Sequence, residues 1–402
     1  MAIEKGMRRA LVISACVLLG AVCVVEATGY AWLLSPVLEG SSRDRFGRVA
    51  GADFRAFHAA AHFAYAGEPD AAYDDARMTS FQRELFGEST GLIAWRYPPP
   101  TLMLIRPLGV LGYASAFALW VALGLLALGV AAFSVSRRLD VTAVVLLSPC
   151  VAFVVVTGQI GLFLAALALA GLGHLKRSPL LAGLCLGALM CKPHLALLVP
   201  VALLAGRQRR AFVGACVMVL ALCLGSLALL GPEPWTLFVR DLLVHGAAAF
   251  TEARVEWARI PTTYILARQL GAGASAAWVV HLGLALVGVA TLVRGWRRPG
   301  ATDGQRALLF VAATLLLVPY AWDYDLVILL APAVLIYRER RGRLTPLVAL
   351  ALVVMASVGI WLRFAVDAVG LQLFPLLWIA LLAWGARDAS WRAAAHPRSA
   401  QI

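Results

Sequence analysis

Dense clusters of arginine and lysine recur at every second connection between apolar runs, and no other feature of the sequence restricts the fold as strongly. The clusters lie at residues 5–9, 137–138, 176–177, 207–210, 294–306, 338–343 and 387–392. Because the cytoplasmic loops of membrane proteins are enriched in Lys and Arg, the alternation predicts that these connections are cytoplasmic. The chain is therefore expected to cross a bilayer many times, with both termini in the cytoplasm and the alternate connections facing outward.

Composition excludes an ordinary soluble domain. The mean hydropathy is +0.83, with 61% hydrophobic and only 14% charged residues. A net charge of +13 would suit a nucleic-acid partner, but the arginines are spread over short loops instead of gathered on one face. We therefore expect anionic lipid headgroups, and not a nucleic acid, to be the partner of these charges. The marked preference for arginine over lysine is typical of a GC-rich bacterial genome, which indicates the bacterial plasma membrane. The seven cysteines form no C-x-x-C pair and are interpreted as packing residues.

The apolar runs predict an all-α polytopic fold with about 12 transmembrane helices, in a single domain over residues 1–390 and a cytoplasmic tail over 391–402. The runs are 10–33, 113–135, 140–157, 160–174, 179–191, 193–206, 211–230, 273–293, 306–320, 324–337, 344–362 and 371–386. Several are shorter than the ~20 residues of a full crossing. Such short helices are expected to line a cavity, since exposed backbone in lipid is costly.

Two outward loops are long, the first over residues 38–100 and the second over 231–263. Within the first loop, the apolar side chains of residues 53–65 recur at helical spacing, which predicts an amphipathic helix on the outer surface. His58 and His62 lie one turn apart on this helix, and His58 is a candidate to contact a substrate. The following run Pro98-Pro99-Pro100 predicts a rigid turn where the chain re-enters the membrane.

Asp53 is the first candidate for chemistry, because it is an acid directly after the first apolar run and at the start of the predicted outer helix. Two roles are open to it. Aspartate is a preferred helix N-cap, where the positive end of the helix dipole stabilises its charge. A carboxylate at the mouth of a cavity can also act as a general base if a hydroxyl group reaches it.

Lys192 is the second candidate, since it interrupts an apolar stretch in the sequence Lys192-Pro193-His194. A lysine is costly in hydrocarbon unless it pairs with an acid, lines a wet cavity or extends from a helix end to the interface. The first two cases suit a cation that binds a phosphate, with His194 adding a hydrogen bond. The third case is structural only.

Polar and aromatic residues on the other outward turns are weaker candidates. Asp323 and Asp325 share the D-x-D spacing that holds a divalent ion in many transferases, but the same residues can cap a helix, and other hard oxygen ligands are scarce nearby, so no metal is expected. Gln159 either binds a sugar hydroxyl or closes a hairpin. Further residues are either interfacial anchors or contacts to a headgroup or sugar: Arg96, Tyr97 and Trp322.

Several short motifs, taken in order, resemble glycosyltransferase family 87. They are Asp53-Phe54 with the helix that follows, residues 67–74 (GEPDAAYD), Tyr97-Pro98-Pro99, Ser148-Pro149 with Gly158-Gln159, residues 183–193 (GLCLGALMCKP) and residues 319–325 (PYAWDYD). The resemblance extends from the first apolar run to about residue 335. Members of this family often carry histidine around the last motif, where this chain has Asp323, Tyr324 and Asp325.

The resemblance implies a GT-C fold and a metal-independent, inverting transfer of a hexose, most often mannose, from a polyprenyl-phosphate sugar to a lipid or glycan acceptor. It implies that Asp53 is the general base, on the periplasmic or external side. Lys192, His194 and Arg96 would then bind the donor phosphate, and Tyr97, Gln159, Trp322, Asp323, Asp325 and His58 the substrates.

Two other functions remain open from the sequence. A transporter or flippase of a lipid-linked or small polar substrate would have a similar number of spans, although the ionisable residues gather on outward turns and the two halves of the chain show no strict repeat. The sequence has no phosphate-binding loop and no dinucleotide fingerprint, which makes an energy-coupled pump unlikely from its motifs. A non-catalytic scaffold would leave Asp53 and Lys192 without a function.

Overall fold

The structure is a computed structural model that describes residues 2–248, 254–340 and 345–387, and these residues are almost entirely helical. The α-helices are α1 (Ala2–Leu38), α2 (Phe54–Tyr65), α3 (Asp75–Phe86), α4 (Pro99–Ile105), α5 (Tyr113–Ser136), α6 (Leu139–Leu146), α7 (Pro149–Thr157), α8 (Gly161–His174), α9 (Pro179–Ala188), α10 (Pro193–Ala196), α11 (Val199–Ala205), α12 (Arg209–Leu230), α13 (Glu233–Ala248), α14 (Thr263–Gln269), α15 (Ala274–Arg297), α16 (Asp303–Leu317), α17 (Leu330–Arg340), α18 (Pro346–Val369) and α19 (Phe374–Ala386). The 3₁₀-helices are η1 (Pro69–Tyr73), η2 (Arg106–Val110), η3 (Leu189–Cys191), η4 (Arg254–Arg259) and η5 (Asp323–Leu329).

Every predicted apolar run is helical, which confirms the all-α class. Twelve full crossings are not shown: among the described residues, α5, α12 and α15 are each long and apolar enough to span a bilayer alone. The pair α6 and α7, bent by 48°, would be a fourth span. Several of the other apolar helices are short and begin at a proline, such as α7, α9 and α10, so an apolar run does not by itself equal a crossing. Apolar side chains on α12 and α15 remain exposed, such as Leu224 (61%) and Leu286 (71%), as expected for helices that face lipid.

Glycines bring α9 and α12 into close contact beside the break at Lys192. A Cβ on Gly183 would lie 1.9 Å from the carbonyl oxygen of Ala211, and a Cβ on Gly187 would lie 2.5 Å from that of Ala215. Two glycines four residues apart lie on one helix face, and in membranes such faces allow helix backbones to approach closely. This packing fixes the end of α9 and therefore the start of the segment that carries Lys192.

The predicted helix over residues 53–65 is present as α2, but it does not lie on the outer surface as expected. Its alanines Ala59, Ala60 and Ala61 are completely buried, and Phe54 and Phe57 are buried with them. Small alanine side chains let η2 pack directly on the helix: a Cβ on Gly109 would lie 2.3 Å from the carbonyl oxygen of Ala61. The sequence pattern identified the helix correctly, but it did not show that η1, η2 and α3 pack against it.

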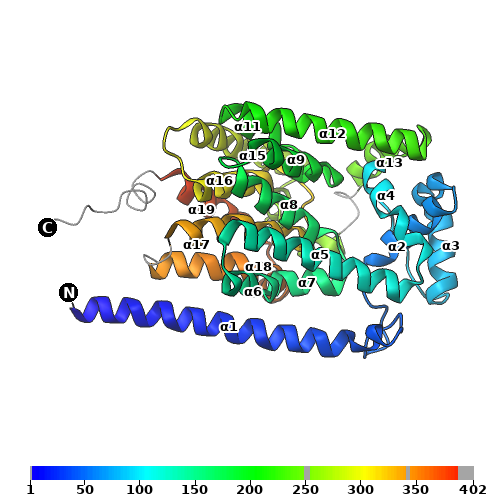
Figure 1. Ribbon diagram of the computed structural model, residues 1–402, viewed down its shortest axis with the longest axis horizontal. Helices are drawn as coiled ribbons and strands as arrows, with labels where there is room; N and C mark the ends of the chain where they lie inside the picture. Colours follow the sequence, from blue (N-terminus) through cyan, green and yellow to red (C-terminus); the bar gives the residue numbers. More distant parts are fainter. Residues whose placement is uncertain (1, 249–253, 341–344, 388–402) are drawn as a thin grey trace.

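The first outward loop forms a compact cap at one end of the helical bundle. Figure 1 shows α2, α3, α4 and α13 gathered at this end, while α1 begins at the opposite end. The proline run does not only turn the chain, because Pro99 and Pro100 begin α4, as the fixed φ of proline favours. Elsewhere, residues from two of the predicted cytoplasmic clusters meet at one acid: Lys176 and Arg338 each lie 2.9 Å from Asp303.

Candidate functional site

Asp53 occupies the N-cap position of α2, but its side chain does not cap the helix. Its carboxylate oxygen Oδ2 instead accepts a hydrogen bond of 3.0 Å from the side-chain amide of Gln159. The Asp53 backbone N–H donates to the carbonyl of Thr157 at 3.0 Å, so two bonds join the start of α2 to the turn between α7 and α8. The interpretation of Asp53 as a capping residue is therefore wrong, and its carboxylate is directed toward this turn.

The turn at Gly158 allows Gln159 to reach Asp53. Gly158 has φ +73°, and a Cβ there would lie 2.6 Å from the Cβ of Phe54, so only glycine fits without displacement. The indole of Trp120 donates to the Gly158 carbonyl at 3.1 Å. Gln159 itself is buried, and its amide oxygen accepts a hydrogen bond of 2.7 Å from the hydroxyl of Tyr97. Because an ionised carboxylate can only accept, the NH₂ group of Gln159 faces Asp53, and the Tyr97 hydroxyl holds the amide in this orientation by donating to its oxygen.

Lys192 is buried beside Asp325, which excludes the interpretation that its ammonium extends to the membrane interface. Its Nζ lies 2.5 Å from Oδ1 of Asp325, with side-chain exposures of 6% and 0%. Nε2 of His194 lies 3.5 Å from the other oxygen of Asp325, and the ammonium lies 4.4 Å from the ring centre of Tyr324. The Lys192-Pro193 break thus carries its cation into a polar centre between η5 and the start of α10.

Arg259, which the sequence reasoning missed, links the other two carboxylates. Its guanidinium lies 3.3 Å from Asp323 and 3.8 Å from Asp53, and 5.1 Å above the ring of Trp322. Burial alone would lower the pKa of Arg259, but the carboxylates of Asp323 and Asp53 outweigh burial and raise this pKa above its ordinary value. No signal in the sequence singled it out, because the predicted outward loops hold several other arginines, such as Arg43, Arg77 and Arg240.

The D-x-D residues do not share one partner. Asp325 pairs with Lys192 and also accepts a hydrogen bond of 3.1 Å from the backbone N–H of Trp322, while Asp323 pairs with Arg259. Among residues 2–248, 254–340 and 345–387, no group of three or more His, Cys, Asp or Glu side chains is arranged to hold a metal ion. The arrangement indicates that these two acids hold the cations Lys192 and Arg259 in place.

These contacts define an inner network that joins residues from distant parts of the sequence. Its members are Asp53, Tyr97, Gln159, Lys192, His194, Arg259, Trp322, Asp323, Tyr324 and Asp325. A cation–π contact of 5.8 Å between Lys192 and Tyr97 connects its two halves. The structure therefore brings the leading candidates Asp53 and Lys192 into one connected set of side chains.

Two of the residues predicted for the site lie outside the inner network. Arg96 pairs with Asp75 at 2.8 Å and with Asp241 at 2.9 Å, in a separate pocket. His58 is buried among aromatic rings, and its Nε2 lies 3.1 Å from the carbonyl oxygen of Leu111. Burial lowers the pKa of His58, which favours the neutral imidazole. The helical spacing of the sequence could not distinguish this inward face of α2 from one open to a substrate.

The fold and the site define a class: a helical, multi-pass membrane protein whose broken helices and long loops bring carboxylates, cations and aromatic rings together. The sequence profile of glycosyltransferase family 87 matches residues 95–319, more than half of the chain, and the chain belongs to this family. It is therefore a membrane glycosyltransferase, and family membership favours this function over a transporter or a scaffold. No curated protein and no solved structure matches the chain. The matched region includes Gln159, Lys192 and Arg259 and leaves Asp53 and Asp325 outside it.

Proposed function

We propose that the protein transfers a hexose, mannose in the first instance, from a polyprenyl-phosphate sugar to a hydroxyl of a lipid or glycan acceptor, with Asp53 as the general base. The observation that carries this proposal is the position of the Asp53 carboxylate. It stands at the start of a helix without capping it, and a buried glutamine directs it toward the same network that holds two cations. A carboxylate so placed is available for proton transfer.

The proposed reaction is a single displacement. The acceptor hydroxyl gives its proton to Asp53 while its oxygen forms a bond to the anomeric carbon of the donor sugar. The bond from that carbon to the phosphate oxygen breaks, and the electron pair leaves with the lipid phosphate, which inverts the anomeric configuration. A phosphate monoester is a good leaving group, so the mechanism requires no general acid and no metal ion.

The cations of the network are proposed to stabilise the departing phosphate. Lys192 and His194 supply charge and hydrogen bonding from the start of α10, although Asp325 already neutralises much of the Lys192 charge. Arg259 is the more accessible cation, with a side-chain exposure of 21% against 6% for Lys192. We therefore propose that Arg259, in place of Arg96, joins Lys192 at the phosphate, because fixed cations stabilise charge that develops in a transition state.

The positions of the remaining residues fit this assignment. Tyr97 and Gln159 align the base, and the parallel rings of Trp322 and Tyr324 offer a flat apolar surface against which a sugar ring can pack. The donor would enter from the bilayer, where its lipid tail stays, on the periplasmic or external side of the bacterial plasma membrane. The basic clusters predict this orientation, with both termini in the cytoplasm.

A transfer assay on the purified full chain in lipid tests the proposal. Radiolabelled polyprenyl-phosphate mannose serves as the donor and a membrane glycolipid extract as the acceptor, for wild type, Asp53→Asn and the control Asp140→Asn. Asp140 is an exposed acid on α6 that pairs with Arg138. We expect Asp53→Asn to lower the rate by about 10²–10⁴-fold, the usual contribution of a general base, and the control to match wild type.

Other outcomes contradict specific parts of the proposal. Wild-type rates in a folded Asp53→Asn protein would exclude Asp53 as the base. Transfer from a polyprenyl-phosphate pentose but not from the mannose donor would correct the sugar. No transfer by wild type from any polyprenyl-phosphate sugar would overturn the donor class.

A further inference from the structure

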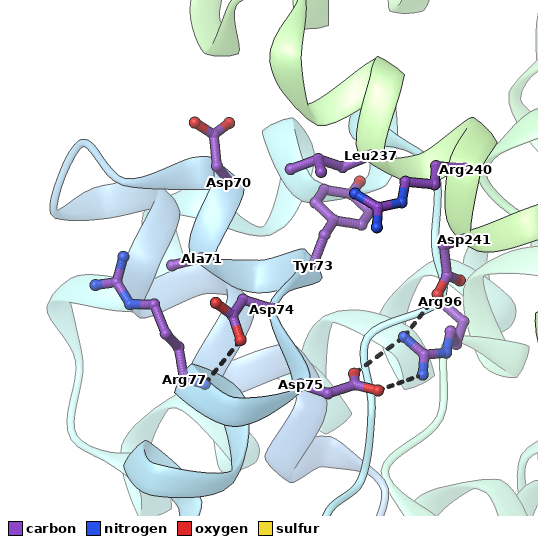
Figure 2. A pocket seen from close by; sticks show the side chains of 10 residues that line it. All are labelled: Asp70, Ala71, Tyr73, Asp74, Asp75, Arg77, Arg96, Leu237, Arg240 and Asp241. Atoms are coloured by element: carbon purple, nitrogen blue, oxygen red, sulfur yellow. Dashed lines mark hydrogen bonds and ion pairs between the residues drawn. The ribbon is translucent and has the colours of Figure 1, made fainter. Parts of the chain in front are cut away.

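A polar pocket lies between the two long loops and is lined by residues of both. This outer pocket has a volume of about 510 Å³ and is lined by Asp70, Ala71, Tyr73, Asp74, Asp75, Arg77, Arg96, Leu237, Arg240 and Asp241. Figure 2 shows Arg96 reaching between Asp75 on α3 and Asp241 on α13, so that it joins the two loops. Pockets that bind small organic ligands commonly have volumes of about 300–1,000 Å³.

The charges of the outer pocket select a class of ligand. Four carboxylates and three guanidinium groups line it, so a free anion or a free cation would meet repulsion from part of the wall. A neutral, hydroxyl-rich ligand meets none, because each hydroxyl can donate to a carboxylate and accept from a guanidinium. Leu237, Ala71 and the ring of Tyr73 add apolar surface that suits the C–H faces of a sugar. In the described part of the chain, the side chains of Asp70 and Arg240 have no hydrogen bond or ion pair, and Arg240 can therefore bind a ligand without losing a partner.

The outer pocket is connected to the inner network through neighbouring residues. Arg96 lines the pocket, and the next residue, Tyr97, orients Gln159 and thereby Asp53. The hydroxyl of Tyr73, another lining residue, donates to the carbonyl oxygen of Tyr97 at 2.9 Å. The outer pocket and the inner network are therefore linked through one short segment, residues 96–97.

We propose that the outer pocket binds the sugars of the acceptor that precede the reacting one, so that the enzyme prefers a neutral oligosaccharide acceptor to a single sugar. The assignment of the bound sugars to the acceptor rests on the proposed function. The recognition of a neutral oligosaccharide rests only on the pocket and can be tested separately.

Binding of free sugars to the full chain in nanodiscs is the first test. The probes are mannotriose, maltotriose and an arabinose trisaccharide, observed by saturation-transfer NMR. Leu237→Trp fills the pocket, and Val239→Trp is the matched control, because Val239 lies on the same helix, is 48% exposed and does not line the pocket. We expect at least one trisaccharide to bind wild type and Val239→Trp equally and to bind Leu237→Trp at least about tenfold more weakly. Absence of binding to wild type, or equal binding to both tryptophan variants, would overturn the proposal.

Acceptor kinetics are the second test, with lipid-linked acceptors that carry one or three sugars. Arg240→Ala removes a donor from the pocket wall at an exposed position, so folding is preserved. We expect it to raise the acceptor KM for three sugars by about tenfold, the effect of a lost charged hydrogen bond, and to leave kcat and the one-sugar KM within about twofold. A uniform loss of kcat for both acceptors would contradict the proposal. If wild type transfers no sugar while Leu237→Trp still abolishes trisaccharide binding, the proposed function fails and the oligosaccharide site stands.

Discussion

The inner network and the outer pocket use the same chemical groups in opposite environments. In the inner network, the paired side chains of Lys192 and Asp325 are 6% and 0% exposed. In the outer pocket, those of Arg96 and Asp75 are 35% and 41% exposed. Water can replace a partner in the exposed pair of Arg96 and Asp75, but not in the buried pair of Lys192 and Asp325. The comparison indicates that the inner charges are fixed in position, as a reaction centre requires, whereas the outer charges can exchange partners, as recognition of a variable ligand requires.

The largest expected effect is at the inner pair. Asp325→Asn leaves the buried ammonium of Lys192 without its counter-charge, and removing one partner of a buried ion pair costs about 3–5 kcal/mol of unfolding free energy. Thermal unfolding in detergent should therefore show a clear fall in Tm. The double variant Lys192→Met with Asp325→Leu should recover much of this loss, since no buried charge remains. A Tm of Asp325→Asn equal to wild type would show that water reaches the pair and would remove the contrast between the two regions.

The next effect concerns the turn that holds the network together. Alanine at Gly158 must adopt a left-handed backbone, which costs about 1–2 kcal/mol, and its Cβ would lie 2.6 Å from the Cβ of Phe54, which adds about 1–3 kcal/mol of overpacking. Gly370→Ala is the matched control, because Gly370 has the same left-handed backbone (φ 72°, ψ 6°) with no atom within 4 Å of an added Cβ. Unfolding of both variants separates the backbone cost from the clash. Equal losses of stability would mean that α2 moves freely away from the turn.

A smaller effect is expected on activity when the base loses its alignment. Gln159→Leu removes the amide that binds Asp53, and we expect kcat to fall about 10–100-fold while the donor KM changes less than about twofold. Tyr97→Phe removes only the hydroxyl that orients this amide and should lie between Gln159→Leu and wild type. A rise in KM without a fall in kcat would instead assign Gln159 to substrate binding, as the sequence alone had allowed.

The smallest effect is expected in the outer pocket. Asp75→Asn removes one of two carboxylates that pair with a half-exposed arginine, and such pairs contribute about 0.2–1 kcal/mol. Unfolding at low salt should detect this loss, and at about 1 M salt the difference from wild type should vanish because the charges are screened. A loss as large as that of Asp325→Asn would show that the outer charges are as fixed as the inner ones.

Much of the fold was predictable because its signals are local. The apolar runs predicted the helices of the bundle but not α3 and α13, which lie in the two predicted loops, and Gly158 and Pro193 predicted breaks between short helices. Local signals could not give the number of crossings, since the length of a run does not say whether the helix crosses the bilayer or ends inside it. They also could not show that α2 is buried, because alanine suits both a surface helix and a closely packed one.

The site was predictable in part for the same reason. Asp53 and Lys192 were conspicuous because each is a charge next to an apolar run, and charges there need a partner. Their partners were not identified, because Gln159 is 106 residues from Asp53 and Asp325 is 133 residues from Lys192 along the chain. Arg259 was missed, and the sequence did not show that Arg96 pairs with Asp75 and Asp241, away from its neighbour Tyr97 in the inner network.

The sequence by itself determined that this chain is a helical membrane protein, and its motifs were enough to indicate its family. Hydropathy and charge act through the free energy of transfer into lipid, and this free energy depends on the residues of each segment alone. Only the tertiary structure decided which carboxylate faces which cation. Such pairs are set by the packing of distant helices, as when the glycine contacts of α9 and α12 fix the segment before Lys192, and no local property of a segment encodes them.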